Sequence, residues 1–426
     1  MRKHISDCLP NSFNVDHISW QQFNQRSSPV VTRERDLQHD SMNKQQLTAA
    51  VIGTGFIGPV HVEGLIRAGV RVAGILGSSP DKSRQTAERL RLPKGYSSLN
   101  EILNDDAVDV VHITSPNRFH FEQTSQLLNA GKHVLCEKPL AMTSQESAEL
   151  VKIAADSGRV AGANYNVRYY PLCIEASERF RNGDIGDLFH VTGSYVQDWL
   201  FHNTDFNWRV MTEAGGELRA VADIGTHWLD LIQFITHRKV TAVCADLQTV
   251  YPKRQRPLGS VETFSGKTNA TDETAAVDIT TEDAGSILLK FAGGGRGSMS
   301  VSQVTAGRKN CLRYEIAGSK QSLTWNSECP NEIRIGHRDR ANETLTRDPA
   351  LMSDRAGSHA DYPGGHNQGF PDTFKQLFRD FYGYIAAGDF SAERTFPTFE
   401  DGHREILLCE AILKSHREQK WIDVSA

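Results

Sequence analysis

Apolar runs and helical patterns alternate along the first part of the chain. The apolar run Leu47–Ile52 ends in glycines, and a helical pattern over Val60–Ala68 follows it. The run Arg71–Leu76 is followed by the helix-forming stretch Pro80–Leu90. Further strand-like runs are Ala107–Thr114, Lys132–Cys136 and Arg159–Ala163, and further helical patterns are Phe119–Ala130 and Ser144–Asp156. Such alternation is typical of βαβ units, so we predict an α/β fold with a parallel sheet and helices on both faces.

Past Tyr170 the pattern changes to successive strand-like runs joined by short turns. These runs are Leu188–Val196, Val240–Val250, Ala275–Thr280, Ser286–Phe291, Gly297–Val304, Leu312–Ala317 and Ser322–Trp325. They predict a large, mostly antiparallel open sheet in an α+β domain. Helical patterns at Thr226–Thr236 and Asp372–Ala386 would cover one face, and a last helical pattern, Gly402–Arg417, precedes Trp421–Val424. We interpret the polar stretches Pro252–Asp272 and Arg338–Gly369 as long loops, either lids or binding loops or else disordered segments.

Size and charge narrow the class of protein. The chain has 426 residues, too many for one ordinary core, which indicates two domains. The net charge of −5 gives no general attraction for nucleic acid or anionic membranes. We expect the basic run Lys253–Arg256 to be a solvated loop.

Cysteine usage and the N-terminus bear on the compartment. The seven cysteines are scattered without a C-x-x-C pair, which favours free thiols in a reducing, cytoplasmic setting and predicts no metal site. No apolar run reaches the roughly 20 residues that span a bilayer. Residues 1–45 are polar and predict a disordered extension. The alternative, an arm that wraps a partner subunit, depends only on Trp20 and Phe23.

A glycine-rich turn, Gly53-Thr54-Gly55-Phe56-Ile57-Gly58, joins the first strand to the first helix. In this context the pattern predicts a dinucleotide site, with backbone close to the pyrophosphate and helix amides facing it. NAD sites usually place an acidic side chain after the second strand. Here Gly77-Ser78-Ser79 occupies that place, with Lys82 and Arg84 shortly behind. NAD and NADP therefore both stay open, and Ser79 could simply cap the next helix.

Four motifs in order give the chain a specific resemblance. They are the glycine-rich turn, Thr114-Ser115-Pro116-Asn117, Glu137-Lys138-Pro139 and Asp223-Ile224-Gly225-Thr226-His227. From Leu47 onward the chain resembles the Gfo/Idh/MocA oxidoreductases, such as glucose–fructose oxidoreductase and inositol dehydrogenase. The resemblance implies a Rossmann dinucleotide-binding domain over 46–168 and a substrate-binding and oligomerisation domain over 169–426, whose last segment could pack back on the first domain. It also implies a homodimer or homotetramer and a cis bond before Pro139.

The resemblance implies a set of residues for each role. The catalytic residues would be Lys138, Asp223 and His227. The coenzyme-binding residues would be Gly53, Gly55, Phe56, Ile57, Gly58, Ser78, Ser79, Ser115, Pro116, Asn117, His120, Glu137, Lys138 and Asn166. The substrate-binding residues would be Lys138, Arg168, Trp199, Trp208, Asp223, His227 and His366. Aromatic faces beside polar groups suit a sugar or polyol, although core packing explains the tryptophans about as well, and the glycine-rich turn at His366 needs no function.

The residue types fit the oxidation of a secondary alcohol. A base must take the hydroxyl proton while a hydride leaves carbon. A histidine titrates near neutrality, and burial beside a positively charged nicotinamide would push a lysine toward its neutral form. Asp223 precedes His227 by four residues, which places both on one side of a helical turn.

We therefore predict an NAD(P)-dependent dehydrogenase or reductase acting on a sugar, anhydrosugar, sugar derivative or cyclitol. Two alternatives stay open: an NAD-dependent glycosidase of the same fold, and a non-enzymatic regulator that binds dinucleotide or sugar. Lys138 together with His227 argues against the regulator.

Overall fold

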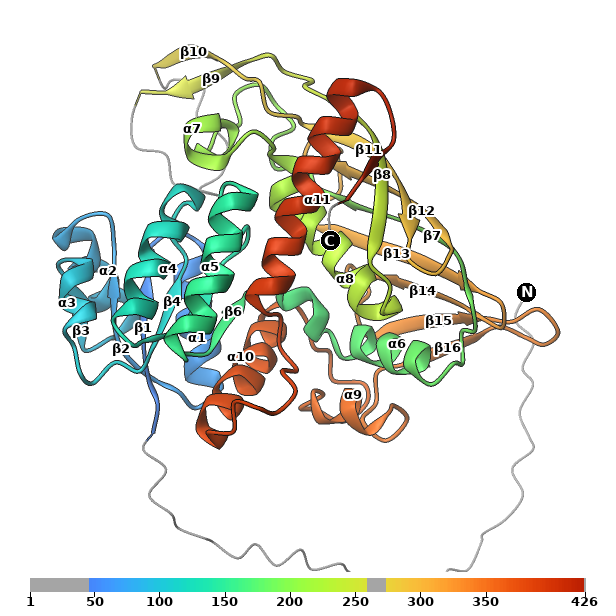
Figure 1. Cartoon of the computed structure of the whole chain (residues 1–426), viewed down its shortest axis with the longest axis horizontal. Helices are drawn as coiled ribbons and strands as arrows, with labels where there is room; N and C mark the ends of the chain where they lie inside the picture. The colour runs from blue at the N-terminus through green and yellow to red at the C-terminus, as the bar shows by residue number, and fades with distance from the viewer. Residues whose placement is uncertain (1–45, 259–272, 425–426) are drawn as a thin grey trace, which may run out of the picture. The chain divides into compact units, whose positions relative to one another are not determined.

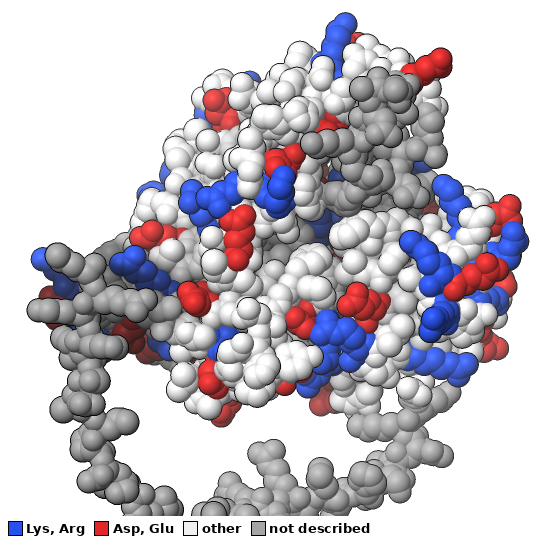
Figure 2. All heavy atoms as spheres, turned by 180° about the vertical axis from the view of Figure 1, so that it is seen from behind, with Lys and Arg blue, Asp and Glu red and all other residues white. Residues whose placement is uncertain are grey.

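The structure is a computed structural model that describes residues 46–258 and 273–424. The predicted N-terminal extension, 1–45, and most of the predicted loop after Pro252 lie outside the described residues. Within the described part no helix is long and apolar enough to cross a membrane. On the face drawn in Figure 2, acidic and basic side chains are interspersed.

The first sheet is parallel, with strand order β3-β2-β1-β4-β5-β6. Its strands are β1 (Thr48–Ile52), β2 (Arg71–Leu76), β3 (Lys94–Tyr96), β4 (Val110–Ile113), β5 (His133–Cys136) and β6 (Ala161–Ala163). This order is that of the doubly wound dinucleotide-binding fold. Successive residues of β1 point to opposite faces, Ala49 and Val51 into one apolar cluster and Ala50 and Ile52 into another.

Helices cover both faces of this sheet. One face packs against α1 (Ile57–Arg67), α2 (Pro80–Leu90) and α10 (Phe370–Ala387). The other packs against α3 (Leu99–Leu103), α4 (His120–Asn129) and α5 (Ser144–Ser157). The chain therefore returns to the first sheet near its C-terminus, because α10 packs on α1.

The second sheet has nine strands in the order β16-β15-β14-β13-β7-β12-β11-β8-β17. They are β7 (Leu188–Val196), β8 (Val240–Gln248), β11 (Ala284–Phe291), β12 (Arg296–Ser302), β13 (Cys311–Gly318), β14 (Ser322–Asn326), β15 (Glu332–Gly336), β16 (Glu343–Thr346) and β17 (Ile422–Asp423). Neighbouring strands are antiparallel except β12 and β7. The predicted fold class is confirmed.

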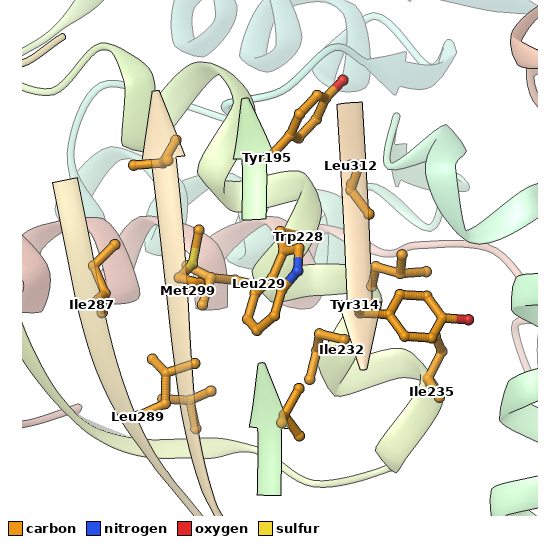
Figure 3. Packing of buried hydrophobic residues seen from close by; sticks show 14 of the residues in the cluster. Tyr195, Trp228, Leu229, Ile232, Ile235, Ile287, Leu289, Met299, Leu312 and Tyr314 are labelled. Carbon is orange, nitrogen blue, oxygen red and sulfur yellow. The ribbon is translucent and has the colours of Figure 1, made fainter. Parts of the chain in front are cut away.

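One face of this sheet carries the largest apolar core. The helices on it are α6 (Pro171–Arg181), α8 (Thr226–Thr236) and α11 (Phe399–Glu418). Figure 3 shows Trp228 of α8 lying over the strands, and its indole nitrogen donates to the Arg313 carbonyl at 2.9 Å. Arg313 and Glu315 of β13 are exposed on the opposite face, so the sheet is open on that side.

Helix α11 runs between the two sheets, in contact with α5 on one side and with α8 and β8 on the other (Figure 1). The shorter elements are η1 (Asn117–Phe119), η2 (Asn166–Tyr169), η3 (Trp208–Val210), α7 (Thr212–Gly215), the π-helix η4 (Val221–Gly225) and α9 (Asp354–Ser358). Polar stretches that we predicted to be loops hold regular structure. Residues 338–369 include β16 and α9.

The basic run Lys253–Arg256 is not a solvated loop, and that prediction is wrong. It lies in β9 (Lys253–Pro257), which pairs with β10 (Thr274–Asp278) in a separate two-stranded sheet. Arg254 has no exposed surface because its guanidinium reaches inward to the buried carboxylate of Asp283.

Candidate active site

A cavity of about 1460 Å³ lies at the carboxyl ends of the first sheet's strands. Its wall includes the glycine-rich turn and Lys138 from the first sheet's side, and Trp208 and His227 from the chain after Tyr170. In open parallel sheets ligands bind at this edge. The cavity is therefore the candidate active site.

The glycine-rich turn is shaped by contacts that exclude side chains. Gly53 has φ +118°, and a Cβ there would lie 2.3 Å from the Thr114 hydroxyl oxygen. A Cβ on Gly58 would lie 2.0 Å from the Gly53 carbonyl oxygen, so α1 packs directly on the turn. Gly55 has open space, since nothing lies within 4 Å of a Cβ built there. The turn is thus closed toward the protein and open toward the cavity.

The turn fits a dinucleotide. Helix α1 begins at Ile57, and no side chain caps its first turn. The amides of a helix N-terminus attract phosphate, and a glycine with open space before it lets a pyrophosphate approach the backbone. Gly53, Gly55, Phe56 and Ile57 line the cavity as predicted, while Gly58 supports the turn from behind.

The end of β2 lacks an acidic side chain. A Cβ on Gly77 would lie 2.9 Å from the Thr54 methyl carbon, so a larger residue there would collide with the turn. Ser78 and Lys82 line the cavity at this end. Ser79 does not, because its hydroxyl caps α2 by accepting the Lys82 amide at 3.3 Å. For Ser79 the capping alternative is the correct one.

The loop after β4 forms the middle of the wall. Ser115, Pro116, Asn117 and His120 all line the cavity. The His120 ring lies between two carbonyls, 2.8 Å from that of Ser115 and 2.7 Å from that of Pro139. It thereby ties this loop to the Glu137-Lys138-Pro139 segment, in which the peptide bond before Pro139 is cis as expected.

Glu137 is held by a buried polar network. Its carboxylate accepts from the Asn164 amide and lies 3.0 Å from His61 Nε2, and it accepts the Lys138 amide at 3.2 Å. Burial alone would raise the Glu137 pKa, but His61 and Lys138 lower it to about 2. The Glu137 carboxylate is therefore ionised and fixed in orientation, and His61 in turn lies 2.9 Å from His112. We did not predict His61, whose place in α1 gives no sign of this partner.

Lys138 is in direct contact with Asp223. Lys138 Nζ lies 3.0 Å from Asp223 Oδ1 and donates to the Asp223 carbonyl at 2.6 Å. Lys138 follows β5, whereas Asp223 belongs to η4, directly before α8 with His227. A π-helical turn here is typical of functional sites. The structure thus brings the three predicted catalytic residues to one wall of the cavity.

The charges of this wall are strongly coupled. Burial would raise the pKa of Asp223, but Lys138 and Arg209 hold it well below its usual range. Burial, and after it the positive charge of Lys138, lower the pKa of His227 to about 3. Asp223 is therefore an anion and His227 a neutral imidazole near neutral pH.

Trp199 and Trp208, which we predicted to bind substrate, both line the cavity. The Arg209 guanidinium lies 4.4 Å from the centre of the Trp208 ring, which keeps the ring in place. Asn166 also lines the cavity. We did not predict Tyr195 of β7, Gln197 just after β7 or Asn310 just before β13 as site residues, although all three line the cavity.

Two residues that we predicted to bind substrate, Arg168 and His366, lie outside the cavity lining. Arg168 is ion-paired with Asp230 of α8 and lies 3.4 Å from Asp401 of α11, so two carboxylates occupy its guanidinium. His366 is exposed, and its loop is held by Arg347, which donates to the His366 carbonyl. Neither residue lines the cavity.

Comparison with known proteins decides the family. Residues 47–165 match the model of the oxidoreductase family with an NAD-binding Rossmann fold, and residues 174–324 match the GFO/IDH/MocA C-terminal domain. The chain belongs to the Gfo/Idh/MocA oxidoreductase family. The predicted family, the enzyme class and the nicotinamide coenzyme are confirmed.

Members of the Gfo/Idh/MocA family with named activities resemble the chain closely. Levoglucosan dehydrogenase of Pseudarthrobacter phenanthrenivorans is 28% identical over 405 residues, covering 89% of this chain and 98% of that protein. 1,5-Anhydro-D-fructose reductase of Ensifer adhaerens is 32% identical over 193 residues, 43% of this chain and 55% of that protein. A structure of levoglucosan dehydrogenase with NADH and levoglucosan has a TM-score of 0.79 at 26% identity, covering 90% of this chain and 100% of that one.

Proposed function

We propose that this enzyme transfers a hydride between a nicotinamide coenzyme and a secondary hydroxyl carbon of a sugar, anhydrosugar, sugar derivative or cyclitol. The observation that carries the proposal is the Lys138–Asp223 ion pair at 3.0 Å, beside His227 and within one cavity with the glycine-rich turn. An ionisable set placed against a dinucleotide site supports proton transfer coupled to hydride transfer.

The proton step uses His227 and Lys138. The bound coenzyme supplies the hydride chemistry, and the chain's own groups handle the hydroxyl proton. Because the low pKa of His227 keeps the imidazole neutral, it has a lone pair that can accept this proton. The carboxylates of Glu137 and Asp223 stabilise the imidazolium that forms, since both raise the His227 pKa. Lys138, fixed by Asp223, donates a hydrogen bond to the reacting oxygen and stabilises its negative charge.

The substrate wall suits a polyhydroxylated ring. Trp199 and Trp208 offer aromatic faces, and Gln197, Arg209 and Asn310 offer polar groups in the same cavity. Apolar walls with a few polar groups are how sites orient small ligands. The named relatives act on levoglucosan and on 1,5-anhydro-D-fructose, which supports an anhydrosugar or a related pyranose as substrate.

Either coenzyme form fits the end of β2. The ribose 2′-hydroxyl would meet Ser78 rather than a carboxylate, and Lys82 would attract a 2′-phosphate. We propose that the enzyme accepts both NAD and NADP, with the order of preference set by Lys82.

A substrate panel tests the proposal. Purified enzyme is offered levoglucosan, 1,5-anhydroglucitol, glucose, methyl glucosides and myo-inositol, each with NAD and with NADP, and the absorbance of the reduced coenzyme is followed. We expect net reduction of the coenzyme, and oxidation of the sugar, with at least one pyranose or anhydrosugar. Cleavage of a glycoside without net reduction would favour the glycosidase alternative, and binding without any reaction would favour a regulator.

A further inference from the structure

A buried cluster of four charged side chains lies next to the substrate wall. It consists of Arg219, Arg254, Glu282 and Asp283, whose exposed fractions are 1%, 0%, 4% and 0%. Both arginines ion-pair with the Asp283 carboxylate. Buried ion pairs cost desolvation energy, and apolar residues often replace them without loss of stability. The cluster is therefore better explained by what it positions than by its contribution to stability.

Arg254 holds the loop that carries the tryptophans. Its guanidinium donates to the carbonyls of Leu200 at 3.0 Å, His202 at 2.8 Å and Asp205 at 3.1 Å. All three carbonyls lie between Trp199 and Trp208 in the chain, and both tryptophans line the cavity. A side chain of the β9–β10 hairpin thus fixes the backbone of the substrate loop.

Glu282 of the cluster fixes the turn that carries Asp223. Glu282 accepts the amide of Arg219 at 3.0 Å and that of Val221 at 2.8 Å. Val221 is the first residue of η4, the π-helix that contains Asp223. The two carboxylates are adjacent in the chain, so one rigid unit holds both the tryptophan loop and the turn of Asp223.

Gln303 also connects the Trp199–Trp208 loop to the turn that carries Asp223. Its side-chain amide donates to Asp223 Oδ2 at 2.9 Å, and its own carbonyl accepts the Leu200 amide at 3.1 Å. Its backbone amide donates to the Asp283 carbonyl at 2.9 Å. The spacing between the aromatic wall and Asp223 therefore depends on the cluster through several bonds.

We propose that Arg254 is a positioning residue that sets the enzyme's affinity for its sugar by holding the Trp199–Trp208 loop at a fixed distance from Asp223. The inference rests on the proposed function of the cavity. An arginine is required because its planar fork reaches three carbonyls and one carboxylate at once, whereas a lysine ammonium cannot. Arg254 lies on the substrate wall's side only, so coenzyme binding does not depend on it.

Arg347 offers a matched control. It is also buried, with 1% of its surface exposed, and its guanidinium also donates to three carbonyls, those of Tyr362, Pro363 and His366. None of these residues lines the cavity. The two arginines therefore hold loops in the same way, but one loop faces the substrate and the other does not.

The test compares Arg254→Met, Arg254→Lys and Arg347→Met in the full chain. We expect both Arg254 variants to raise KM for the best sugar of the panel about 10-fold or more, because small displacements of a binding wall are costly. The dissociation constant for NADH should stay within about twofold in all three variants, a change below about 0.4 kcal/mol. Arg347→Met should lower the melting temperature but leave the sugar KM within the same limit.

A second measurement does not require turnover. Hydrogen exchange of the amides in residues 198–211 should become faster in the Arg254 variants and not in Arg347→Met. If Arg254→Met fails to fold, Arg254→Lys keeps the positive charge beside Asp283 and decides the question. An unchanged sugar KM, or an equal rise in Arg347→Met, would overturn the proposal. If none of the sugars in the panel lets the wild type reduce the coenzyme, the proposed function fails. Hydrogen exchange of residues 198–211 still tests whether Arg254 holds the loop.

Discussion

The two walls of the cavity are built on different principles. The coenzyme wall is made of backbone: the turn Gly53–Gly58, the loop after β4 and the N-terminus of α1. The substrate wall is made of side chains, Trp199, Asp223 and His227 among them, from segments distant in the chain. Backbone can bind phosphates in any sequence that allows the turn, while recognition of a particular sugar requires particular side chains in fixed positions. The first wall therefore needs little more than a backbone turn that admits phosphate, and the second wall is where substrate specificity is set.

The walls also differ in what holds them. Steric contact holds the glycine-rich turn, because Gly53 and Gly58 leave no room for a Cβ. Buried charge holds the substrate wall, through Lys138 with Asp223 and Arg254 with Asp283. A substitution in the first wall should therefore act through volume, and one in the second through charge and orientation. Four predictions examine this difference.

The largest effect is expected at Lys138, the residue that joins the two walls. Lys138→Met should lower kcat by about 10²- to 10⁴-fold, because it removes a group that acts on the reacting oxygen. NADH binding should change little. Steady-state kinetics and NADH fluorescence titration measure the two effects separately.

Lys132 is the control for this change. It lies at the other end of β5, is 8% exposed, and donates from Nζ to the carbonyls of Asp105 and Val108, both at 2.8 Å. Lys132→Met should lower the melting temperature without a comparable loss of kcat. Full turnover by Lys138→Met would show that the assigned proton chemistry is wrong.

Two glycines separate folding from coenzyme binding on the first wall. Gly53→Ala should reduce the free energy of unfolding by about 1–3 kcal/mol, because the residue has φ +118° and its Cβ would collide with Thr114. Gly55→Ala should leave the melting temperature unchanged, since its Cβ meets nothing within 4 Å. The Cβ of Gly55→Ala would instead occupy space in front of the pyrophosphate, so we expect NADH to bind about 10-fold more weakly.

Thermal unfolding and NADH titration of both variants check this pair. Unchanged NADH affinity in Gly55→Ala would mean that the pyrophosphate does not approach the turn there. Another part of the coenzyme wall would then have to bind the pyrophosphate.

The same difference explains what could be predicted from the sequence. The coenzyme wall is encoded in contiguous motifs, and local patterns gave β2, α2, β7 and α8 with the bounds that the structure has. Hydrophobic period and capping residues determine such elements locally.

The substrate wall depends on partners that a local pattern does not contain. We expected Arg168 to bind the sugar, but its guanidinium is ion-paired with Asp230 and Asp401. We expected Arg254 to lie in a solvated loop, but it is buried, and its guanidinium binds Asp283 and three loop carbonyls. In each case the partner lies on another element, so burial and pairing became visible only once the chain was folded.

The third prediction concerns pH. The pKa of His227 is lowered to about 3 in the folded protein, chiefly by burial, against about 6.5 when unfolded. Below about pH 6.5 the unfolded chain takes up a proton that the folded chain does not, so stability at this site is full above pH 6.5 and is lost as the pH falls toward 3. Urea unfolding should show that the wild type loses about 1 kcal/mol more than His227→Gln between pH 6.5 and 5.5.

The contribution of Glu137 to stability, on the coenzyme wall, is lost at a lower pH than that of His227. Its pKa falls to about 2 from 4.5, so its contribution to stability is lost only below about pH 4.5. Wild type and His227→Gln share every other titratable group, so the contributions of those groups cancel from the difference. Equal pH dependence of wild type and His227→Gln would show that the imidazole is not neutral in the folded state.

The smallest effect is expected at the ribose end of the coenzyme wall, where a side chain rather than backbone does the selecting. Lys82 lines the cavity beside Ser78, and no carboxylate follows β2 at Gly77 to compete for it. Lys82→Ala should weaken NADPH binding by about 3- to 10-fold and NADH binding by less than about twofold, because only NADPH carries the 2′-phosphate. The control is Lys94→Ala, which breaks an exposed ion pair with Glu101 at 2.8 Å outside this cavity and should change neither affinity. An equal loss for both coenzymes would place Lys82 at the pyrophosphate instead, and charge rather than backbone would then hold part of the first wall.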